Sequence, residues 1–495
     1  MKTGFFFYKK SNNDKIQIDM SATFDTRVQE LKYKVLKEIA KAYYNGTLLE
    51  DYNSIPNKIV PGPKPTMRCC IYKERAIVLE RMKLALGGSK EIDNVIEVIK
   101  IACDGCPLGG YEVTNRCRGC IAHRCQMACH KDAISFDIVT HAARIDKDKC
   151  INCGMCAKAC QYNAIQNYLR PCEQACKVKA ISMDEDYSAK IDDEKCVQCG
   201  ACVYQCPFGA IMDKSYIKEA IDILRDGQDG KIYPTVAIVA PSISSQFKYA
   251  SLGQIATALH KLGFTEIVEA ALGADIVSFN EGKELAEKGF LTSSCCPTFV
   301  TYIQKYFPTL TDHISSNLSP MASIAKWIKE HYPKAKIIFI GPCISKKKEV
   351  LTDRVKPYVD VALTFEELQA LIDAKEIDAS SLEESPFDNA SYFGRIFARS
   401  GGLTDAVRQS LKEHNLDFDY RPISADGLEN CRLALLKAKS GTQDFNFIEG
   451  MGCVGGCIGG PCCLTHEVRN KADVDKYGMQ AKAQTISESL AILKK

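Results

Sequence analysis

Cysteine spacing constrains this 495-residue chain more than any other feature, because sixteen of its 26 cysteines fall between Cys103 and Cys206. Two stretches carry the same run, Cys-x2-Cys-x2-Cys-x3-Cys, one starting at Cys150 and the other at Cys196. Such runs bind 4Fe-4S cubanes, with three cysteines on one cluster and the fourth on a neighbouring cluster. Zinc knuckles and buried thiols are the alternatives, and two matching four-ligand runs disfavour both. Residues 96–215 are therefore predicted to form ferredoxin-like iron–sulfur domains of the α+β class.

The sixteen cysteines are enough for up to four cubanes. The crossing rule divides the two regular runs into Cys150, Cys153, Cys156 and Cys206 for one cubane and Cys196, Cys199, Cys202 and Cys160 for another. Eight further cysteines have less regular spacing, and we divide them into Cys117, Cys120, Cys125 and Cys176 for a third cubane and Cys103, Cys106, Cys172 and Cys129 for a fourth. An Ala-Ile pair follows each Cys-x3-Cys, which indicates one unit repeated four times. The alternative for the irregular eight is a single cubane, or a zinc ion in place of one.

A second group of cysteines lies in three separated motifs of the C-terminal half, at Cys296, Cys343, Cys453 and Cys457. Four thiolates can hold one cubane. An extra thiol, Cys295, precedes the first of them, and Lys346 follows the second by three residues. These two additions indicate a centre that is more reactive than a plain cubane.

The pattern of apolar and polar residues changes after Cys206, where strand-like and helix-like stretches alternate. Apolar runs predict strands at 235–239, 266–268 and 337–340, and Thr364-x-x-Glu367 is a capping box that predicts a helix start. Strand–helix alternation implies a parallel α/β architecture over residues 216–495. Ligands in such sheets lie at the C-terminal ends of the strands, where Cys343 would be. Residues 1–95 read as a helical or irregular region without a recognisable role.

Composition excludes several classes of protein. With 46% hydrophobic and 25% charged residues the chain has an ordinary globular profile, and a formal charge of +3 argues against a general nucleic-acid partner. No uncharged apolar run reaches 18 residues, so we expect no membrane segment. The apolar run at 4–8 is too short for a signal peptide. So many thiolate-bound clusters lead us to expect a reducing, anaerobic cytoplasm.

The three C-terminal motifs resemble the signature segments of the FeFe (iron-only) hydrogenases, from about Ala240 to the C-terminus. The resemblance implies a catalytic domain of two lobes with parallel sheets. It implies that one H-cluster is bound, a 4Fe-4S part on Cys296, Cys343, Cys453 and Cys457 and a di-iron subsite with CO, cyanide and azadithiolate ligands. It implies surrounding roles as follows: Cys295 carries protons, Lys346 hydrogen-bonds a cyanide, Met451 packs over the di-iron subsite, and Ala240, Pro241 and Ser242 form a turn beside the distal cyanide.

The same resemblance implies a proton path through Glu281, Ser315 and Glu284. A spacing of three places the two glutamates on one side of a helix, so a relay between them is feasible. The alternative is that both are solvated helix charges. The implied activity is reversible oxidation of H2 and reduction of protons, with electrons passing through cubanes to a ferredoxin-type partner. Hydrogenase maturation proteins would build the di-iron subsite.

Several positions depart from the best-known members and indicate a less-studied branch. Gly341 stands where they have methionine, Met321 where they have glutamine, and residues 459–463 carry Cys462 and Cys463, which we interpret as structural thiols. Residues 465–495 resemble a segment that other members carry as a separate small subunit. Three other functions compete: an iron–sulfur assembly protein of the Nar/Narf type without the di-iron subsite, a hydrogen sensor, and a pure electron carrier.

Overall fold

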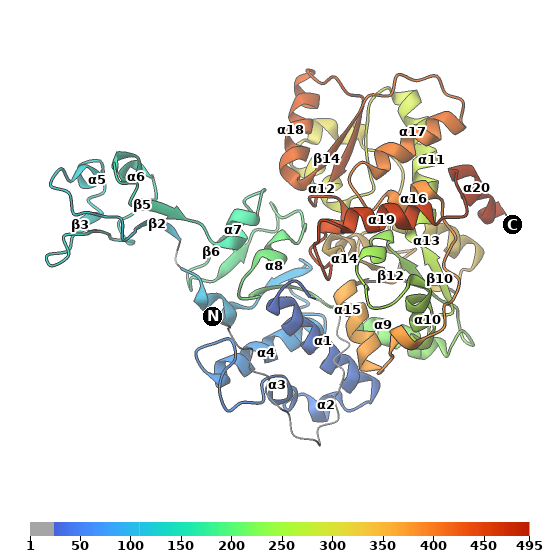
Figure 1. Ribbon diagram of the computed structural model, residues 1–495, viewed down its shortest axis with the longest axis horizontal. Coiled ribbons are helices and arrows are strands. Elements are labelled where there is room, and N and C mark those ends of the chain that lie inside the picture. The colour runs from blue at the N-terminus through green and yellow to red at the C-terminus, as the bar shows by residue number, and fades with distance from the viewer. Residues whose placement is uncertain (1–23, 108, 495) are drawn as a thin grey trace, which may run out of the picture.

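A computed structural model describes residues 24–107 and 109–494, shown in Figure 1 as a large body with a lobe that projects from it. The apolar run at 4–8 lies outside these described residues. No helix in the described ranges has both the length and the apolar character of a membrane span.

The N-terminal region is helical and belongs to the core of the body. Its helices are α1 (Arg27–Tyr44), α2 (Leu48–Asp51), α3 (Ile55–Ile59) and α4 (Ile71–Ala85). The side chain of Thr26 accepts a hydrogen bond from the Gln29 amide and caps α1. Leu36 and Ile39 on this helix are fully buried in the cluster that also holds the catalytic strands. The N-terminal region, for which the sequence predicted no role, therefore packs into the core of the catalytic domain.

Two iron–sulfur modules follow, one inserted into the other. The inserted module, residues 109–168, contains the antiparallel pairs β2–β5 (Gly110–Val113, Ile165–Tyr168) and β3–β4 (Ile134–Phe136, Ala143–Ile145), with α5 (Arg124–Met127) and α6 (Met155–Ala159). The base module, residues 96–107 and 169–213, contains the pairs β1–β8 (Ile96–Val98, Ile211–Asp213) and β6–β7 (Ile181–Met183, Ala189–Ile191), with α7 (Pro171–Ala175) and α8 (Ala201–Gln205). The inserted module is the projecting lobe of Figure 1.

The catalytic domain has two parallel sheets, as predicted. The first has the order β10-β9-β12-β13 (Glu266–Glu269, Thr235–Val239, Lys336–Gly341, Val361–Thr364), and the second has the order β11-β15-β14 (Leu291–Thr292, Phe447–Met451, Pro422–Asp426). The helices around them are α9 (Ile217–Gly227), α10 (Leu252–Leu262), α11 (Ala270–Lys288), α12 (Pro297–Tyr306), α13 (Pro320–His331), α14 (Ile344–Val350), α15 (Phe365–Ala374), α16 (Tyr392–Ile396), α17 (Gly402–Glu413) and α18 (Gly427–Ser440). Every residue of β9 and β15 is buried, as expected for parallel strands covered on both faces. The predicted capping box at Thr364 opens α15.

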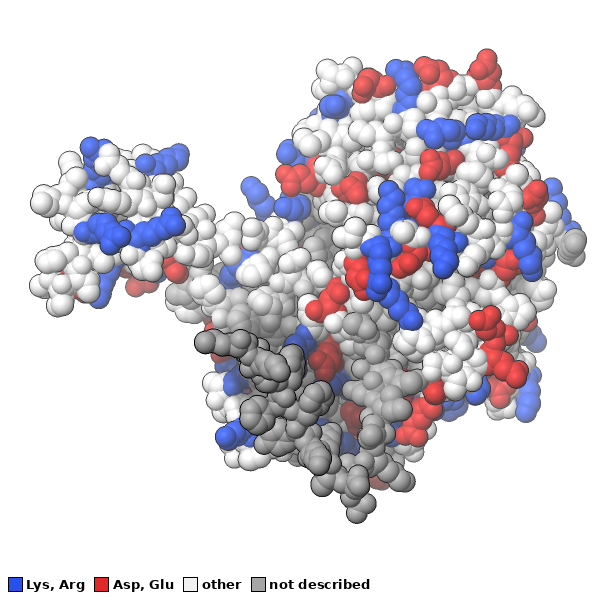
Figure 2. All heavy atoms as spheres, in the orientation of Figure 1, with Lys and Arg blue, Asp and Glu red and all other residues white. Residues whose placement is uncertain are grey.

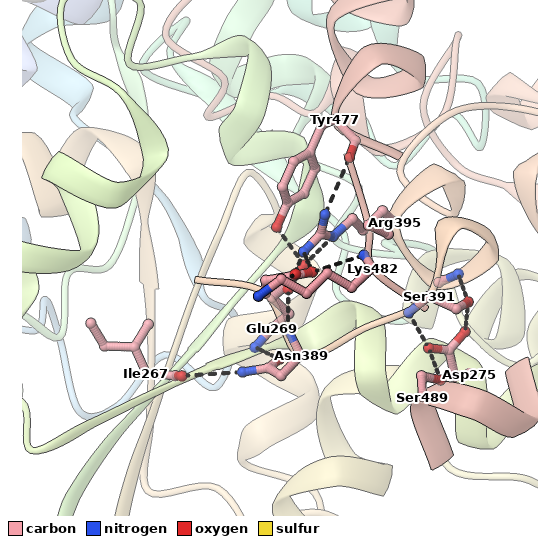
Figure 3. Close-up of polar contacts among 12 residues, drawn as sticks. Ile267, Glu269, Asp275, Asn389, Ser391, Arg395, Tyr477, Lys482 and Ser489 are labelled. Carbon is pink, nitrogen blue, oxygen red and sulfur yellow. Dashed lines mark hydrogen bonds and ion pairs between the residues drawn. The ribbon is translucent and has the colours of Figure 1, made fainter. Parts of the chain in front are cut away.

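The C-terminal segment is locked onto the catalytic domain by buried polar contacts (Figure 3). It carries α19 (Asn470–Met479) and α20 (Ile486–Leu490). Arg395 donates two hydrogen bonds of 2.8 Å to Glu269, and the Tyr477 hydroxyl donates to the same carboxylate. The Ser489 hydroxyl donates to Asp275 at 2.7 Å. Residues 465–494 thus pack as an integral part of this domain.

A buried ionic cluster joins α1, the base module and the catalytic domain. The Lys347 ammonium lies 2.8 Å from Asp213 and 2.8 Å from Glu367, and all three side chains are buried. Lys32 lies 2.6 Å from the other oxygen of Asp213 and also pairs with Glu366. Its ammonium occupies the position that a cation would take among Asp213, Glu366 and Cys462. The three parts of the chain are therefore held together by charge pairs that water does not reach.

Candidate active site and electron path

The four predicted cysteines of the C-terminal half meet at the C-terminal ends of strands from both sheets. Cys296 comes shortly after β11, Cys343 follows β12, and Cys453 and Cys457 follow β15. Burial raises the pKa of Cys457 to about 12, and the neighbouring Cys343 and Cys296 thiols add to the shift. The pKa of Cys453 rises well above its ordinary value for the same reasons. Four converging, half-buried thiols fit a metal cluster, because metal binding displaces their protons.

Hydrogen bonds to these sulfur atoms come from residues that the sequence interpretation did not single out. The Gly452 amide donates to Cys296 Sγ at 3.4 Å, and the Ser345 hydroxyl lies 3.2 Å from Cys343 Sγ. Thr298 Oγ1 in turn lies 2.8 Å from Ser345 Oγ. Such contacts tune the potential of an iron–sulfur cluster. The position of Ser345 inside the second motif could have signalled this role, whereas that of Thr298 depends on the approach of α12 to α14.

The wall beside the four cysteines carries polar atoms without partners. Cys295 is buried, and within the described chain the hydroxyls of Ser242 and Ser294 have no hydrogen-bond partner. Lys346 reaches the carbonyl of Cys295 at 3.4 Å and pairs with Glu349 at 2.6 Å. Unpaired buried polar groups are rare and call for a missing partner. Hydroxyl and ammonium donors beside a cubane site fit a larger group with anionic acceptors, as the H-cluster's cyanides would be.

The remaining predicted wall residues lie at the same strand ends. Ala240 is held beside β12 by a hydrogen bond of 2.9 Å from its amide to the Ile340 carbonyl. Pro241 begins the short helical turn after β9, and Met451 ends β15 with 3% of its surface exposed. The structure therefore brings the predicted turn and the predicted methionine to the same end of the two sheets as Cys343 and Cys453.

Steric crowding explains why position 341 is occupied by glycine. A Cβ atom there would lie 2.7 Å from Phe339 Cζ and 3.1 Å from the Cβ of Ala240. Phe339 and Gly341 share one face of β12, and the phenyl ring occupies the space that a longer side chain would need. The departure from the family's methionine is therefore paired with a phenylalanine two residues earlier.

The proton-path residues lie in a series that runs from the site towards the surface. Glu281 on α11 is fully buried, and one of its oxygens accepts from the Ser294 amide at 3.4 Å while the other has no partner in the described chain. The Ser315 hydroxyl donates to Glu284 at 2.9 Å. Glu284 also pairs with Lys288 at 2.8 Å, and the Lys288 side chain is 40% exposed. Glu281 is not a solvated helix charge, so that alternative is wrong for it.

The two glutamates differ in charge. Burial raises the pKa of Glu281 to about 8, although the neighbouring Ser315 hydroxyl and Ser294 amide act in the opposite direction. For Glu284 burial is outweighed by hydrogen bonds from Lys288 and Ser316, so its pKa is lowered. Near neutral pH the inner carboxyl is therefore protonated and the outer one is ionised. Burial, with the neighbouring Glu281, also raises the pKa of Cys295 well above its ordinary value.

Comparison with known proteins agrees with this geometry. Residues 233–461 match the family model described as iron only hydrogenase large subunit, C-terminal domain. This part of the chain belongs to the iron-only hydrogenase family. Residues 143–166 and 189–212 match the 4Fe-4S binding domain.

Relatives within and around this hydrogenase family differ in their described roles. Iron hydrogenase 1 of Clostridium pasteurianum is 29% identical over 64% of this chain and 64% of its own length. The periplasmic Fe hydrogenase large subunit of Nitratidesulfovibrio vulgaris is 29% identical over 65% of this chain and 86% of its own. The cytosolic Fe-S cluster assembly factor NAR1 of Botryotinia fuckeliana is 32% identical over 24% and 25%. A solved FeFe-hydrogenase of Chlamydomonas reinhardtii shares 19% identity with a TM-score of 0.47, over 57% of this chain and 93% of its own.

The sixteen cysteines of the two modules group differently from our prediction. In the inserted module of this hydrogenase-family chain, burial raises the pKa of Cys125, with Cys160 and Cys120 as neighbouring causes. Cys156 is shifted by burial and by Cys150 and Cys129, and Cys129, Cys150, Cys153 and Cys156 line one cavity. The inserted module therefore brings Cys120, Cys125 and Cys160 together, and Cys129, Cys150, Cys153 and Cys156 together. Its remaining thiol, Cys117, would complete the first group as a set of four ligands.

The base module shows the same arrangement. Burial raises the pKa of Cys172 to about 12, with Cys206 and Cys103 among the neighbouring causes, and Cys106 has Cys206 and Cys103 as neighbours. Cys199 has Cys196 and Cys176 beside it. The thiols thus gather into two groups that would serve as ligand sets, Cys103, Cys106, Cys172 and Cys206, and Cys176, Cys196, Cys199 and Cys202. The predicted exchange of Cys206 and Cys160 between the two regular runs is wrong, because each regular run crosses with the irregular run inside its own module.

Contacts between the sets define an order. After burial and the thiols of its own site, the pKa of Cys453 is shifted by Cys199. Cys202 has Cys172 among its neighbouring causes. The set containing Cys199 therefore lies between the four-cysteine site of the catalytic domain and the set containing Cys172. Cys462 and Cys463 are fully buried, and Cys463 Sγ donates to the carbonyls of Cys457 and Ile458, as expected for structural thiols.

Proposed function

We propose that the protein is a hydrogenase that catalyses the reversible conversion of H2 into two protons and two electrons at an H-cluster. Cys296, Cys343, Cys453 and Cys457 would hold the cluster. When bound, this group supplies the iron site at which hydrogen is activated. The carrying observation is the series formed by the buried Cys295, Glu281 and Ser315 and the half-buried Glu284, because a plain cubane needs no such series of proton carriers beside it.

The chain's own residues would move the protons. A Cys295 thiol that resists ionisation keeps its proton until a neighbouring base takes it. Glu281, with a pKa of about 8, can both accept and release a proton near neutral pH. Ser315 can donate to one carboxylate while it accepts from the other, and the ionised Glu284 carries the proton towards Lys288 and water. The ammonium of Lys346 would orient anionic acceptors in the site.

The sixteen thiols of the two modules support four further cubanes as an electron path. Their order runs from Cys453 through the Cys199 and Cys172 sets to the inserted module. We expect a ferredoxin-type protein to exchange single electrons with this path. Hydrogenase maturation proteins would have to supply the di-iron subsite.

An iron–sulfur assembly protein is the second candidate, because the chain also matches a protein named as an assembly factor. That function would use the cubane sites alone. Cys295 and Lys346, with the unpaired hydroxyls beside them, favour the hydrogenase. Retention of the buried thiol Cys295 likewise favours turnover over hydrogen sensing.

An infrared spectrum and a turnover assay on one anaerobic preparation test the proposal. The protein is produced with and without the hydrogenase maturation proteins, and the second preparation is the matched control. We expect bands of iron-bound CO and cyanide, together with H2-dependent viologen reduction, only in the first. Bands without turnover would support the sensor, and cubanes without these bands in the maturated protein would support the assembly function.

A further inference from the structure

The inserted module carries a net positive charge that the rest of the chain lacks. Residues 109–168 contain eight Lys and Arg against five Asp and Glu, a formal +3 that equals the charge of all 495 residues. Figure 2 shows Lys and Arg side chains over the visible face of this lobe and Asp and Glu side chains along its lower edge, whereas both signs mix throughout the body. A charged projection attracts a partner of opposite sign over the range of a Debye length, about 8–10 Å at physiological salt.

Ion pairing leaves one part of the lobe basic. Three of the five acidic groups of the lobe are in ion pairs. Arg144 pairs with Asp137, Lys147 lies 3.6 Å from Glu112, and Lys149 lies 3.7 Å from Asp146. Five exposed cations have no ion-pair partner among the described residues, namely Arg116, Arg118, Arg124, Lys131 and Lys158. Most of them lie on residues 116–127 and on α6, and α5 packs against α6. We call this surface the basic face.

Exposed apolar side chains stand among these cations. Ile121 is 99% exposed and Met127 is 80% exposed. Ile121 follows the cluster ligand Cys120 directly, and Met127 lies between Cys125 and Cys129. Apolar surface rimmed by charged residues marks interaction sites on soluble proteins. On the basic face they lie within one or two residues of the thiols that would hold the outermost cubanes.

We propose that the basic face of the inserted module docks a small acidic protein that carries one electron at a time. The inference rests on the proposed function, which requires such an exchange. Electron-transfer complexes are small and short-lived, and opposite charges speed their encounter more than they strengthen binding. A few unpaired cations around a small apolar centre meet these requirements, and the projection of the lobe leaves room for the partner (Figure 1).

A second opening near the clusters has a different character. A cleft between the base module and α18 is lined by Cys199 and Cys453. Lys177 and Lys471 line it together with Asp426, Glu429 and Glu467, so it carries both signs of charge. An acidic carrier would gain little electrostatic attraction from this cleft, because the carboxylates that line the cleft offset the attraction of its two lysines. The charge distribution therefore favours the basic face.

The test compares two charge-reversed variants that change the same number of charges. One carries Arg118→Glu, Arg124→Glu and Lys158→Glu on the basic face. The control carries Lys261→Glu, Lys334→Glu and Lys412→Glu, three exposed lysines of the catalytic domain. A recombinant acidic two-cubane ferredoxin, reduced beforehand, is mixed with each protein in the absence of hydrogen. Stopped-flow absorbance then reports how fast the cubanes of the chain become reduced.

We expect the second-order rate of the basic-face variant to fall at least about tenfold at low salt. Its dependence on salt should flatten, while the control stays within about twofold of the wild type. Viologen-linked turnover with H2 should be unchanged in both. A wild-type rate in the basic-face variant would overturn the proposal, as would a loss of rate in a Lys177→Glu/Lys471→Glu variant of the cleft instead.

Two checks keep the result interpretable. If the charge-reversed variant lacks iron, the neutral set Arg118→Gln, Arg124→Gln and Lys158→Gln replaces it, with a smaller decrease in rate expected. If the wild type shows no H2 turnover but its cubanes accept electrons in the same charge-dependent way, the proposed function fails while the docking face stands.

Discussion

Replacement of Glu281 by glutamine separates the proton path from the fold. The carboxyl is fully buried, and burial raises its pKa to about 8. Near pH 7 roughly nine in ten molecules carry it protonated, so a neutral amide of the same shape preserves charge and packing. An amide cannot accept a proton from Cys295 and release it to Ser315. The substitution therefore removes one function and little structure.

The magnitude follows from these two properties. Loss of a positioned acid–base group costs about 10²–10⁴-fold in rate. The dependence of folding stability on pH gives a second test of the same carboxyl. A carboxyl with a folded-state pKa of about 8, against 4.5 in the unfolded chain, binds more protons when folded, so stability falls as pH rises between these values. Between about pH 6 and pH 8 the wild type should lose about 2 kcal/mol that the glutamine variant keeps.

The assay is H2-dependent viologen reduction by anaerobic, maturated protein across this pH range. Glu287→Gln is the matched control, because Glu287 is exposed on the same helix and belongs to no ion pair among the described residues. Infrared spectra should show a protonated carboxyl band that disappears in Glu281→Gln and titrates near pH 8 in the wild type. Turnover within about threefold of the wild type in Glu281→Gln would refute the proton-path reasoning.

Other substitutions test the site and its supports. Cys295→Ala should abolish turnover and leave the iron content nearly unchanged; near-normal activity would refute its proton role. Lys347→Met should lower the free energy of unfolding by about 3–5 kcal/mol in guanidinium denaturation, because it leaves the buried Glu367 without its ion-pair partner and Asp213 with Lys32 alone; a loss below about 1 kcal/mol would contradict the ionic junction. Gly341→Met should reduce cluster occupancy, measured by iron content, because the new side chain meets Phe339. Phe339→Ala should restore occupancy in the double variant, and a single variant with full occupancy would show that the ring moves freely.

Much of the site could be predicted from sequence because its chemistry is carried by short motifs. Cys296, Cys343 and Cys453 each follow a strand directly or within a few residues, and parallel strands bring such positions to one edge of their sheets. The strand at 235–239 and the helix cap at Thr364 were likewise predictable, because they depend on neighbours in the chain.

The pairing of the module cysteines could not be predicted in this way. Both Cys160 and Cys206 are fourth members of regular runs, and the spacing alone is equally compatible with an exchange between those runs. The structure shows instead that residues 109–168 are inserted as a complete module. Each fourth cysteine therefore meets the irregular run that packs against its own helices.

The sequence by itself determined which atoms are available: four thiols in three separated motifs, an extra cysteine and lysine, and two glutamates three residues apart. Only the tertiary structure decided how those atoms behave. Glu281 and Glu284 have the same side chain, yet burial keeps the first protonated while Lys288 and the Ser316 amide keep the second ionised. Solvation and the geometry of neighbours set a pKa, and both arise from segments far apart in the chain.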